Sequence, residues 1–288
     1  MSVKKYIKRV GRYLLKGLPV NHITTNIVTI GPNELLKGRK ALITGGTSGI
    51  GYAIASAYLR SGASVIITGR TEQRLENSVK KLAEENPSAK DRFLFVVMDN
   101  KEISSFRSLF DNNPILKEID ILVNNAGVLG GDISIATEED YDSILDTNLK
   151  GTFFLSQLVA RNMKERSVKG NILNIASSSS LRPAASAYTI SKWGIRGFTL
   201  GLAKVLAPYG ITVNGLAPGP TATPMLVGGN ITEITLDSSP VGRYAMPEEI
   251  ANMAVFLTSE MGRMIVGDIV YMTGGAGLIT LDDTYYQF

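Results

Sequence analysis

The 288-residue sequence contains no cysteine and only one histidine, His22. The first absence excludes disulfide bonds, thiolate metal sites and cysteine nucleophiles, and it is compatible with a reducing compartment. The second excludes a multi-histidine metal cage and leaves the main body of the chain without the base of a Ser-His-Asp triad. Apolar runs long enough for a secretory signal or a membrane span are also missing. We therefore expect a cytoplasmic protein.

Positive charge is concentrated at the N-terminal end of the chain. Residues 1–38 hold seven of the 30 Lys and Arg residues but only one of the 26 acidic residues. The rest of the chain is therefore slightly acidic, although the formal net charge of the whole chain is +4. A protein that reads nucleic acid usually has a basic face on its folded domain. We therefore expect no nucleic-acid partner.

Within this basic arm, residues 3–18 have an amphipathic pattern. Lysines and arginines fill the positions between apolar side chains. The apolar side chains recur at helical spacing, at Val3, Ile7, Val10, Leu14 and Leu18. One interpretation is a short helix that packs on its own domain or on a partner subunit. Another is a peripheral helix on a membrane surface, to which basic amphipathic segments bind. A targeting segment or a loose tail remains a third interpretation.

From residue 39 onward, short apolar runs alternate with segments of helical character. This alternation predicts one α/β domain over residues 39–288, ending in a short C-terminal tail, with a Rossmann-like doubly wound sheet of about seven parallel strands and helices on both faces. The strands should be buried on both faces. The predicted strands are 40–44, 64–68, 92–97, 120–124, 171–176, 211–216 and 268–272. The predicted helical segments are 50–61, 71–85, 101–117, 137–165, 186–208 and 247–258.

A glycine-rich turn, TGGTSGIG at residues 44–51, follows the first strand and opens the first helix. Glycines at 45, 49 and 51 let backbone N–H groups and the helix N-terminus face a pyrophosphate. The spacing is G-x-x-x-G-x-G, which differs from the more familiar G-x-G-x-x-G. The predicted phosphate-binding residues are Gly45, Thr47, Ser48, Gly49, Ile50 and Gly51.

The end of the second strand bears on the choice of dinucleotide. A site for NAD(H) usually has an acidic residue there, which binds the ribose 2′-hydroxyl. This sequence has Gly69-Arg70-Thr71 instead, and the planar guanidinium of Arg70 suits a 2′-phosphate. We therefore predict NADP(H) rather than NAD(H), with a surface arginine as the alternative interpretation of Arg70.

Taken in order, the motifs resemble the short-chain dehydrogenase/reductase family in its compact one-domain form, and the 3-oxoacyl-ACP reductases among its members. The resemblance covers residues 39 to about 277. It rests on eight features in sequence: the turn at 44–51, Asp99, NNAG at 124–127, Asn148 in DTNLKG, the serines after NILNIA, YTISK at 188–192, PGPTAT at 218–223, and GRYAMPEEIA followed by TGG.

The resemblance implies an oxidoreductase that transfers a hydride between the nicotinamide and a carbonyl or secondary alcohol. Tyr188 would exchange the proton and Lys192, one helical turn away, would lower the pKa of Tyr188 and bind ribose. Ser177 would bind the substrate oxygen, with Ser178 as the alternative, because only eleven residues separate Ser177 from Tyr188 where the family usually has about thirteen. Asn148 would hold a water that links the lysine to solvent.

The same resemblance implies the remaining cofactor contacts. The adenine would lie near Asp99 and Asn100, while the adenine ribose would lie near Asn125, Ala126 and Gly127. Asn124 is expected to brace the sheet. The nicotinamide amide would be held by Pro218, Gly219, Thr221 and Thr223.

Two other classes of function compete with this hypothesis. A catalytically silent dinucleotide sensor or scaffold would keep the fold but lose the tyrosine, lysine or serine, which are all present. An epimerase or dehydratase on the same fold would need a larger C-terminal substrate region. The segment 224–246, where the family has a mobile lid, has no Lys or Arg before Arg243, so a ketone, a 3-oxoacyl thioester and a polyol all stay open as small-molecule substrates. Members of the family usually associate through the helices that correspond to 137–165 and 186–208, so the resemblance implies a homodimer or homotetramer.

Overall fold

A computed structural model describes residues 34–277 of the chain, except 90, 228–233 and 237–238. The predictions for the N-terminal segment 3–18 and for the tail at 278–288 therefore lie outside the described residues. Among the helices that are described, none has the length and apolar character needed to cross a membrane.

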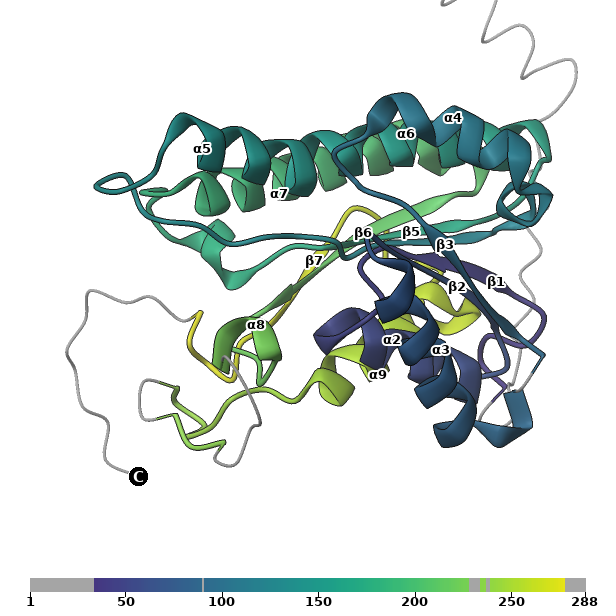
Figure 1. Ribbon diagram of the computed structural model, residues 1–288, viewed down its shortest axis with the longest axis horizontal. Coiled ribbons are helices and arrows are strands. Elements are labelled where there is room, and N and C mark those ends of the chain that lie inside the picture. Colours follow the sequence, from purple (N-terminus) through teal and green to yellow (C-terminus); the bar gives the residue numbers. More distant parts are fainter. Residues whose placement is uncertain (1–33, 90, 228–233, 237–238, 278–288) are drawn as a thin grey trace, which may run out of the picture. The chain divides into compact units, whose positions relative to one another are not determined.

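Seven parallel strands form one sheet in the order β3-β2-β1-β4-β5-β6-β7 (Figure 1). This order and the strand number confirm the predicted doubly wound architecture. Each predicted strand is present within two residues of its expected ends. The strands are β1 (Lys40–Ile43), β2 (Ser64–Gly69), β3 (Phe93–Val97), β4 (Ile121–Asn124), β5 (Asn171–Ile175), β6 (Thr212–Pro218) and β7 (Ile269–Met272).

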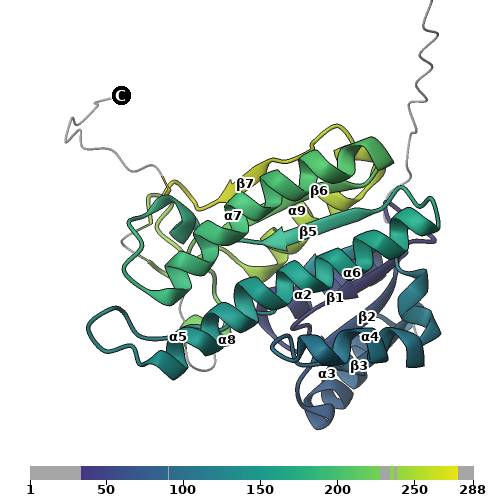
Figure 2. The ribbon, with the colours of Figure 1, turned by 90° about the horizontal axis from the view of Figure 1, so that it is seen from above.

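Helices cover the two faces of the sheet (Figure 1). Successive side chains of a strand point to opposite faces, so Ala41 and Ile43 of β1 pack in one core while Leu42 packs in the other. Figure 2 shows α6 and α7 lying next to each other on one face. One layer contains α2 (Gly49–Arg60), α3 (Glu72–Glu85) and α9 (Pro247–Thr258); the other contains α4 (Ile103–Asn112), α5 (Glu138–Leu145), α6 (Gly151–Glu165) and α7 (Ala187–Leu206).

Burial on both faces holds for the central strands but is wrong for the two edge strands. All residues of β4, β5 and β6 are buried. In β3 the side chain of Leu94 is 53% exposed, and no residue of β7 is fully buried. A strand at the edge has a neighbour on one side only, so the helical layers leave part of it open to solvent.

The segment 137–165, predicted as one helical stretch, is two α-helices joined by a π-helical turn at Asp146–Lys150. Its predicted start is confirmed, because the Thr137 hydroxyl accepts a hydrogen bond from the N–H of Asp140 (3.1 Å). Inserted π turns often occur at functional sites. Here the turn carries Asn148, one of the predicted site residues.

Candidate active site

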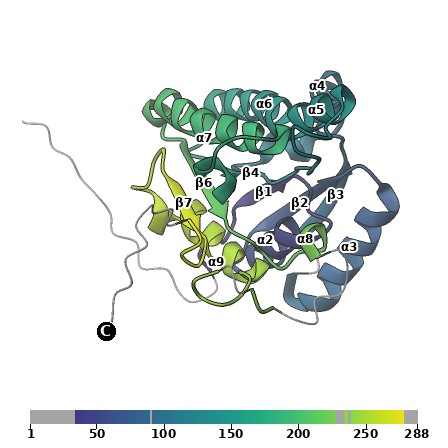
Figure 3. The ribbon, with the colours of Figure 1, turned by 90° about the vertical axis from the view of Figure 1, so that its left-hand side faces the viewer.

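The carboxyl ends of the strands surround a cavity of about 560 Å³. Figure 3 views the described domain from the side where the chain leaves β6 for the short helix α8 (Pro224–Val227). The strand order reverses direction between β1 and β4, and ligands bind at such a switch point in doubly wound sheets. The lining comes from segments that follow β1, β2, β3, β4, β5 and β6, and from α7.

The glycine turn after β1 forms one wall of this cavity. Gly45 (φ +64°) and Gly49 (φ +54°) adopt left-handed backbone conformations that favour glycine. Thr47, Ser48, Gly49 and Ile50 all line the cavity. The Ser48 side chain does not cap α2, and the first turn of α2 has no acidic residue. The first amide groups of α2 are therefore open to an anion.

Gly51 has a different role from the predicted one. It does not line the cavity, and a Cβ at this position would collide with the carbonyl oxygen of Gly45 and with Nδ2 of Asn125. Gly51 therefore allows the turn to close rather than contacting a ligand.

The NNAG segment is bonded directly to the glycine turn. The Thr44 hydroxyl accepts hydrogen bonds from the N–H of Asn125 (3.0 Å) and of Ala126 (2.9 Å). In return, Nδ2 of Asn125 donates to the carbonyl oxygens of Thr44 (2.9 Å) and Gly45 (3.0 Å). Asn125, Ala126 and Gly127, which were predicted to lie near the adenine ribose, all line the cavity, but the Asn125 amide holds the turn.

Two other asparagines lie outside the cavity lining. Asn124 is buried and donates to Asn174 Oδ1 (2.8 Å) on the neighbouring strand, which confirms its predicted role as a brace of the sheet. Asn148 is also buried: Oδ1 accepts from the N–H of Val128 (2.8 Å), while Nδ2 donates to the Val128 carbonyl oxygen (3.0 Å) and to Ser191 Oγ (3.2 Å). The π turn thus directs the Asn148 side chain toward the start of the β4–α5 loop, not into the cavity.

The end of the cavity next to β2 is basic. Arg70, the predicted 2′-phosphate ligand, lines the cavity, and Arg74 lines it as well. Neither arginine forms an ion pair within the described part of the chain. Asp99 and Asn100 also line the cavity, and among the described residues Asp99 is the only carboxylate in the lining. Sequence reasoning missed Arg74, although its place four residues after Arg70 was a usable signal.

At the other end of the cavity Ser177, Tyr188 and Lys192 lie together. The Ser177 side chain lies close to the Tyr188 hydroxyl and lowers its pKa. Nζ of Lys192 lies 5.5 Å from the centroid of the Tyr188 ring and donates to the carbonyl oxygen of Ile175 (2.8 Å). Burial lowers the pKa of Lys192 to about 8. An acid–base pair and a hydroxyl donor therefore share one pocket wall.

The expected lowering of the pKa of Tyr188 by Lys192 is not what the structure shows. Burial raises the pKa of Tyr188, and the Ser177 side chain opposes this effect only in part. Removal of the phenol from water disfavours the phenolate, and the ammonium group of Lys192 is directed at a backbone carbonyl.

The geometry favours Ser177 over Ser178. Ser177 and Ser178 are both buried and both line the cavity. Ser177 lies close to the Tyr188 hydroxyl and influences its pKa, and the Ser177 hydroxyl accepts from the N–H of Ser179 (3.1 Å) at the start of a 3₁₀ turn, Ser178–Leu181. This arrangement favours Ser177 as the residue that acts together with Tyr188.

The segment after β6 and several apolar side chains complete the lining. The predicted residues of this segment all line the cavity: Pro218, Gly219, Thr221 and Thr223. Sequence reasoning assigned no role to several further lining residues, among them Val128, Leu129, Thr147, Ser179, Arg182, Met225 and Leu226.

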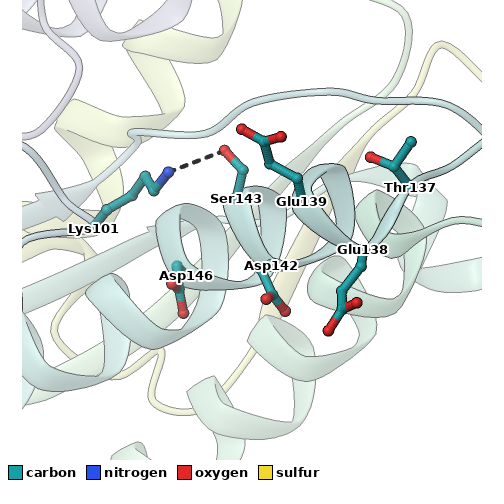
Figure 4. A pocket seen from close by; sticks show the side chains of 7 residues that line it. All are labelled: Lys101, Thr137, Glu138, Glu139, Asp142, Ser143 and Asp146. Carbon is teal, nitrogen blue, oxygen red and sulfur yellow. Dashed lines mark hydrogen bonds between the residues drawn. The ribbon is translucent and has the colours of Figure 1, made fainter.

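A second hollow of about 580 Å³ lies beside α5 and shares no lining residue with the first (Figure 4). Four carboxylates line it, and Lys101 points toward Ser143, to which its Nζ donates (3.4 Å). It has neither a glycine turn nor a Tyr–Lys pair. Among the described residues no cluster of His, Asp and Glu is arranged to hold a metal ion.

A parallel sheet with this strand order, a glycine turn after β1 and a Tyr–Lys pair at the carboxyl edge defines the class of dinucleotide-dependent α/β oxidoreductases. Residues 39–233 match the short chain dehydrogenase family. The chain is 34% identical over 247 residues to a 3-oxoacyl-[acyl-carrier-protein] reductase FabG of Aquifex aeolicus, covering 83% of this chain and 98% of the relative. This chain belongs to the short chain dehydrogenase family.

Two solved structures are also similar. One is a gluconate 5-dehydrogenase from Burkholderia cenocepacia in complex with NADP and tartrate, with a TM-score of 0.77 and 30% identity, covering 86% of this chain and 99% of that chain. The other is a 3-ketoacyl-(acyl-carrier-protein) reductase from Brucella melitensis complexed with NADH, with a TM-score of 0.74 and 30% identity, covering 84% and 99%. These relatives differ in substrate and in bound cofactor.

Proposed function

We propose that this oxidoreductase of the short chain dehydrogenase family transfers a hydride between NADP(H) and a carbonyl or secondary alcohol substrate. The observation that carries the proposal is one cavity with two chemically different ends. Ser177, Tyr188 and Lys192 lie at one end, and Arg70 and Arg74 lie at the other. A hydride-transfer enzyme needs a proton donor near the nicotinamide and an anchor for the adenosine phosphate.

The residues present fit a dinucleotide. The glycine turn has no Cβ atoms to obstruct a pyrophosphate at Gly45 and Gly49, which line the cavity, and the N-terminus of α2 has no side-chain cap. The guanidinium groups of Arg70 and Arg74, which form no ion pair with any described residue, suit the 2′-phosphate that distinguishes NADP(H) from NAD(H). NAD(H) is the alternative, and the NADH-bound relative is a reason to test it.

The bound nicotinamide supplies the hydride in reduction and accepts it in oxidation. In reduction, Tyr188 gives its phenolic proton to the carbonyl oxygen, so that the alcohol forms without a free alkoxide. The Ser177 hydroxyl, already directed at Tyr188, binds the same oxygen and positions it. Tyr188 enters this step as the neutral phenol, because burial raises its pKa.

Lys192 supports the proton transfer by Tyr188 through its positive charge. A group with a pKa of about 8 is mostly protonated at pH 7, so Lys192 is a buried cation 5.5 Å from the Tyr188 ring. Its positive charge stabilises the phenolate that exists after proton transfer, and it can return a proton to that oxygen. Asn148 holds the β4–α5 loop in place through Val128, and we propose that it supports Lys192 through the π turn rather than through its side chain.

We also propose a homodimer or homotetramer formed through α6 and α7. Phe153 (42% exposed) and Phe154 (38%) lie on α6, and the Phe153 ring packs against Phe198 of α7 with a centroid distance of 5.1 Å. Leu200 extends this apolar face and is 48% exposed. Light scattering on the full chain tests the proposal, and Phe154→Asp should shift the mass toward the monomer.

The test of the main proposal is a fluorescence titration of the purified protein with NADPH and with NADH, followed by a screen of ketones and 3-oxoacyl esters. Tight NADPH binding that weakens in Arg70→Ala supports the proposal. Stronger NADH binding would reverse the cofactor assignment and favour alcohol oxidation. If neither dinucleotide binds, the proposal fails. The hypothesis of a catalytically silent dinucleotide-binding scaffold fails with it, because that scaffold also requires the dinucleotide.

A further inference from the structure

The loop between β5 and α7, where this chain is shorter than the family pattern, brings an arginine to the cavity. Residues Ser178–Leu181 form a 3₁₀ turn, and Arg182 leaves it in an extended conformation (φ −106°, ψ 156°). The next residue is Pro183, which disfavours a helical conformation at Arg182. The turn therefore ends at Arg182 beside Ser177, Ser178 and Ser179, and all four residues line the cavity.

The backbone of Arg182 is held at both of its polar groups. Its N–H donates to the carbonyl oxygen of Ser179 (3.2 Å), and its own carbonyl oxygen accepts from Nε1 of Trp193 on α7 (2.8 Å). Nη1 of Arg196 also donates to the carbonyl oxygen of Ser180 (3.2 Å) in the same turn. These bonds fix the loop relative to Tyr188, which lies on the same helix as Trp193 and Arg196.

The guanidinium group of Arg182 is exposed, and within the described ranges it takes part in no ion pair or side-chain hydrogen bond. The nearest acidic residue along the adjoining loop is Asp132, which pairs with Ser186 in a short bridge. Its carboxylate accepts from the N–H of Ser134 (2.9 Å) instead. The positive charge of Arg182 is thus available to a ligand at the catalytic end of the cavity.

The cavity lining also includes exposed apolar side chains. Leu129 follows β4, and Met225 and Leu226 belong to α8; all three are between 43% and 58% exposed and line the same cavity. A ligand in contact with Ser177 and Tyr188 would therefore meet an apolar wall and one cation. Arg70 and Arg74 stand at the opposite end, which the adenosine phosphate would occupy, so they do not compete for this ligand.

We propose that Arg182 binds an anionic group of the carbonyl substrate, so that the preferred substrates join a carbonyl, a short apolar segment and a carboxylate or phosphate. The inference rests on the proposed function, because it places the carbonyl at Ser177 and Tyr188. A planar guanidinium pairs with either anion through two parallel N–H bonds.

The experiment compares matched substrates with saturating NADPH. One pair is 4-oxopentanoate and its methyl ester; the other is 4-oxopentyl phosphate and the neutral alcohol 5-hydroxypentan-2-one. The ratio of kcat/KM for the anionic over the neutral member should fall about tenfold in Arg182→Ala for at least one pair. Arg182→Lys should recover part of the ratio, because it retains the charge without the fork. The pair affected distinguishes a carboxylate from a phosphate.

Arg161→Ala is the matched control, because Arg161 is an exposed arginine of α6 that does not line the cavity. An unchanged ratio for both pairs in Arg182→Ala would overturn the proposal even if the enzyme turns over. Dissociation constants of the same compounds from the enzyme–NADP⁺ complex separate the hypothesis of an anion site at Arg182 from the hypothesis of oxidoreductase activity. An Arg182-dependent preference for the anion without any turnover keeps the anion site and refutes the oxidoreductase; equal binding of anion and neutral partner refutes the anion site.

Discussion

The two ends of the cavity are built by different means. The cofactor wall consists mainly of backbone: a glycine turn, the start of α2 and the NNAG segment. The Thr44 hydroxyl accepts, and the Asn125 side chain donates, the hydrogen bonds that join the turn to this segment. The catalytic wall consists of side chains: Ser177, Tyr188 and Lys192, with Arg182 at its border. Substitutions in the first wall should therefore disturb folding and dinucleotide binding together, whereas substitutions in the second should change chemistry and specificity with little effect on the fold.

The largest expected effect is on chemistry alone. Tyr188→Phe removes the proton donor but keeps the ring, so kcat should fall about 1000-fold or more. Removal of the hydroxyl should cost only about 1 kcal/mol of unfolding free energy. Steady-state kinetics, NADPH titration and thermal melting of the same preparation check this. Retention of most of the activity would contradict the assignment of Tyr188.

The next effect is a pH dependence of stability set by Lys192. Burial lowers the pKa of Lys192 from 10.5 to about 8 in the folded chain. Between these values the unfolded chain binds more protons than the folded chain. The free energy of unfolding of the cofactor-free protein should therefore rise with pH from about 8 to 10. The gain over the whole range between the two pKa values would be about 3 kcal/mol. Above pH 10 the raised pKa of Tyr188 acts in the opposite direction, because the folded chain then retains its proton.

Chemical denaturation at several pH values measures this slope, and Lys192→Met should flatten it. The same slope in the variant and the parent would show that another group is responsible. Arg70→Ala is a suitable control, since the pKa of no buried group depends on it.

A smaller effect on stability is expected in the backbone-built wall. A Cβ at position 51 would collide with Gly45 and Asn125, so Gly51→Ala should lower the free energy of unfolding by about 2 kcal/mol and weaken NADPH and NADH equally. Ala substitution at Gly197, where a Cβ would have open space within helix α7, is the control and should be neutral or slightly stabilising. Loss of NADPH binding without loss of stability would mean that Gly51 contacts the cofactor directly.

The smallest expected effect is on the Kd of NADPH, and it comes from substitutions of arginine side chains in the cofactor wall rather than of its backbone turn. Arg70→Ala and Arg74→Ala should each raise the Kd of NADPH about tenfold while leaving the Kd of NADH almost unchanged. Fluorescence titration at fixed ionic strength measures both constants, since ionic strength affects charged pairs. A parallel loss of both cofactors in the two variants would argue against the 2′-phosphate contact.

Most of the fold could be predicted from the sequence, because buried strands and amphipathic helices have distinct periodicities. Every strand was located, and the alternation with helices gave the parallel architecture. The exposure of Leu94 could not be predicted, because the order of the strands decides which of them lie at the edge. The π turn at Asp146–Lys150 was also missed, since no local sequence pattern distinguishes it from a continuous helix.

For the site, the residue types and their order along the chain were enough to identify the glycine turn, the serines and the pair Tyr188–Lys192. Tertiary structure decided what each group does. It placed the Asn148 amide against Val128, closed the glycine turn over Gly51, and raised the pKa of Tyr188 by burial where a helical lysine alone would have lowered it. It also brought Arg74 and Arg182 to opposite ends of one cavity. Spacing along the chain determines which groups can share a helix face, whereas burial and electrostatic surroundings depend on segments that meet only when the sheet is formed.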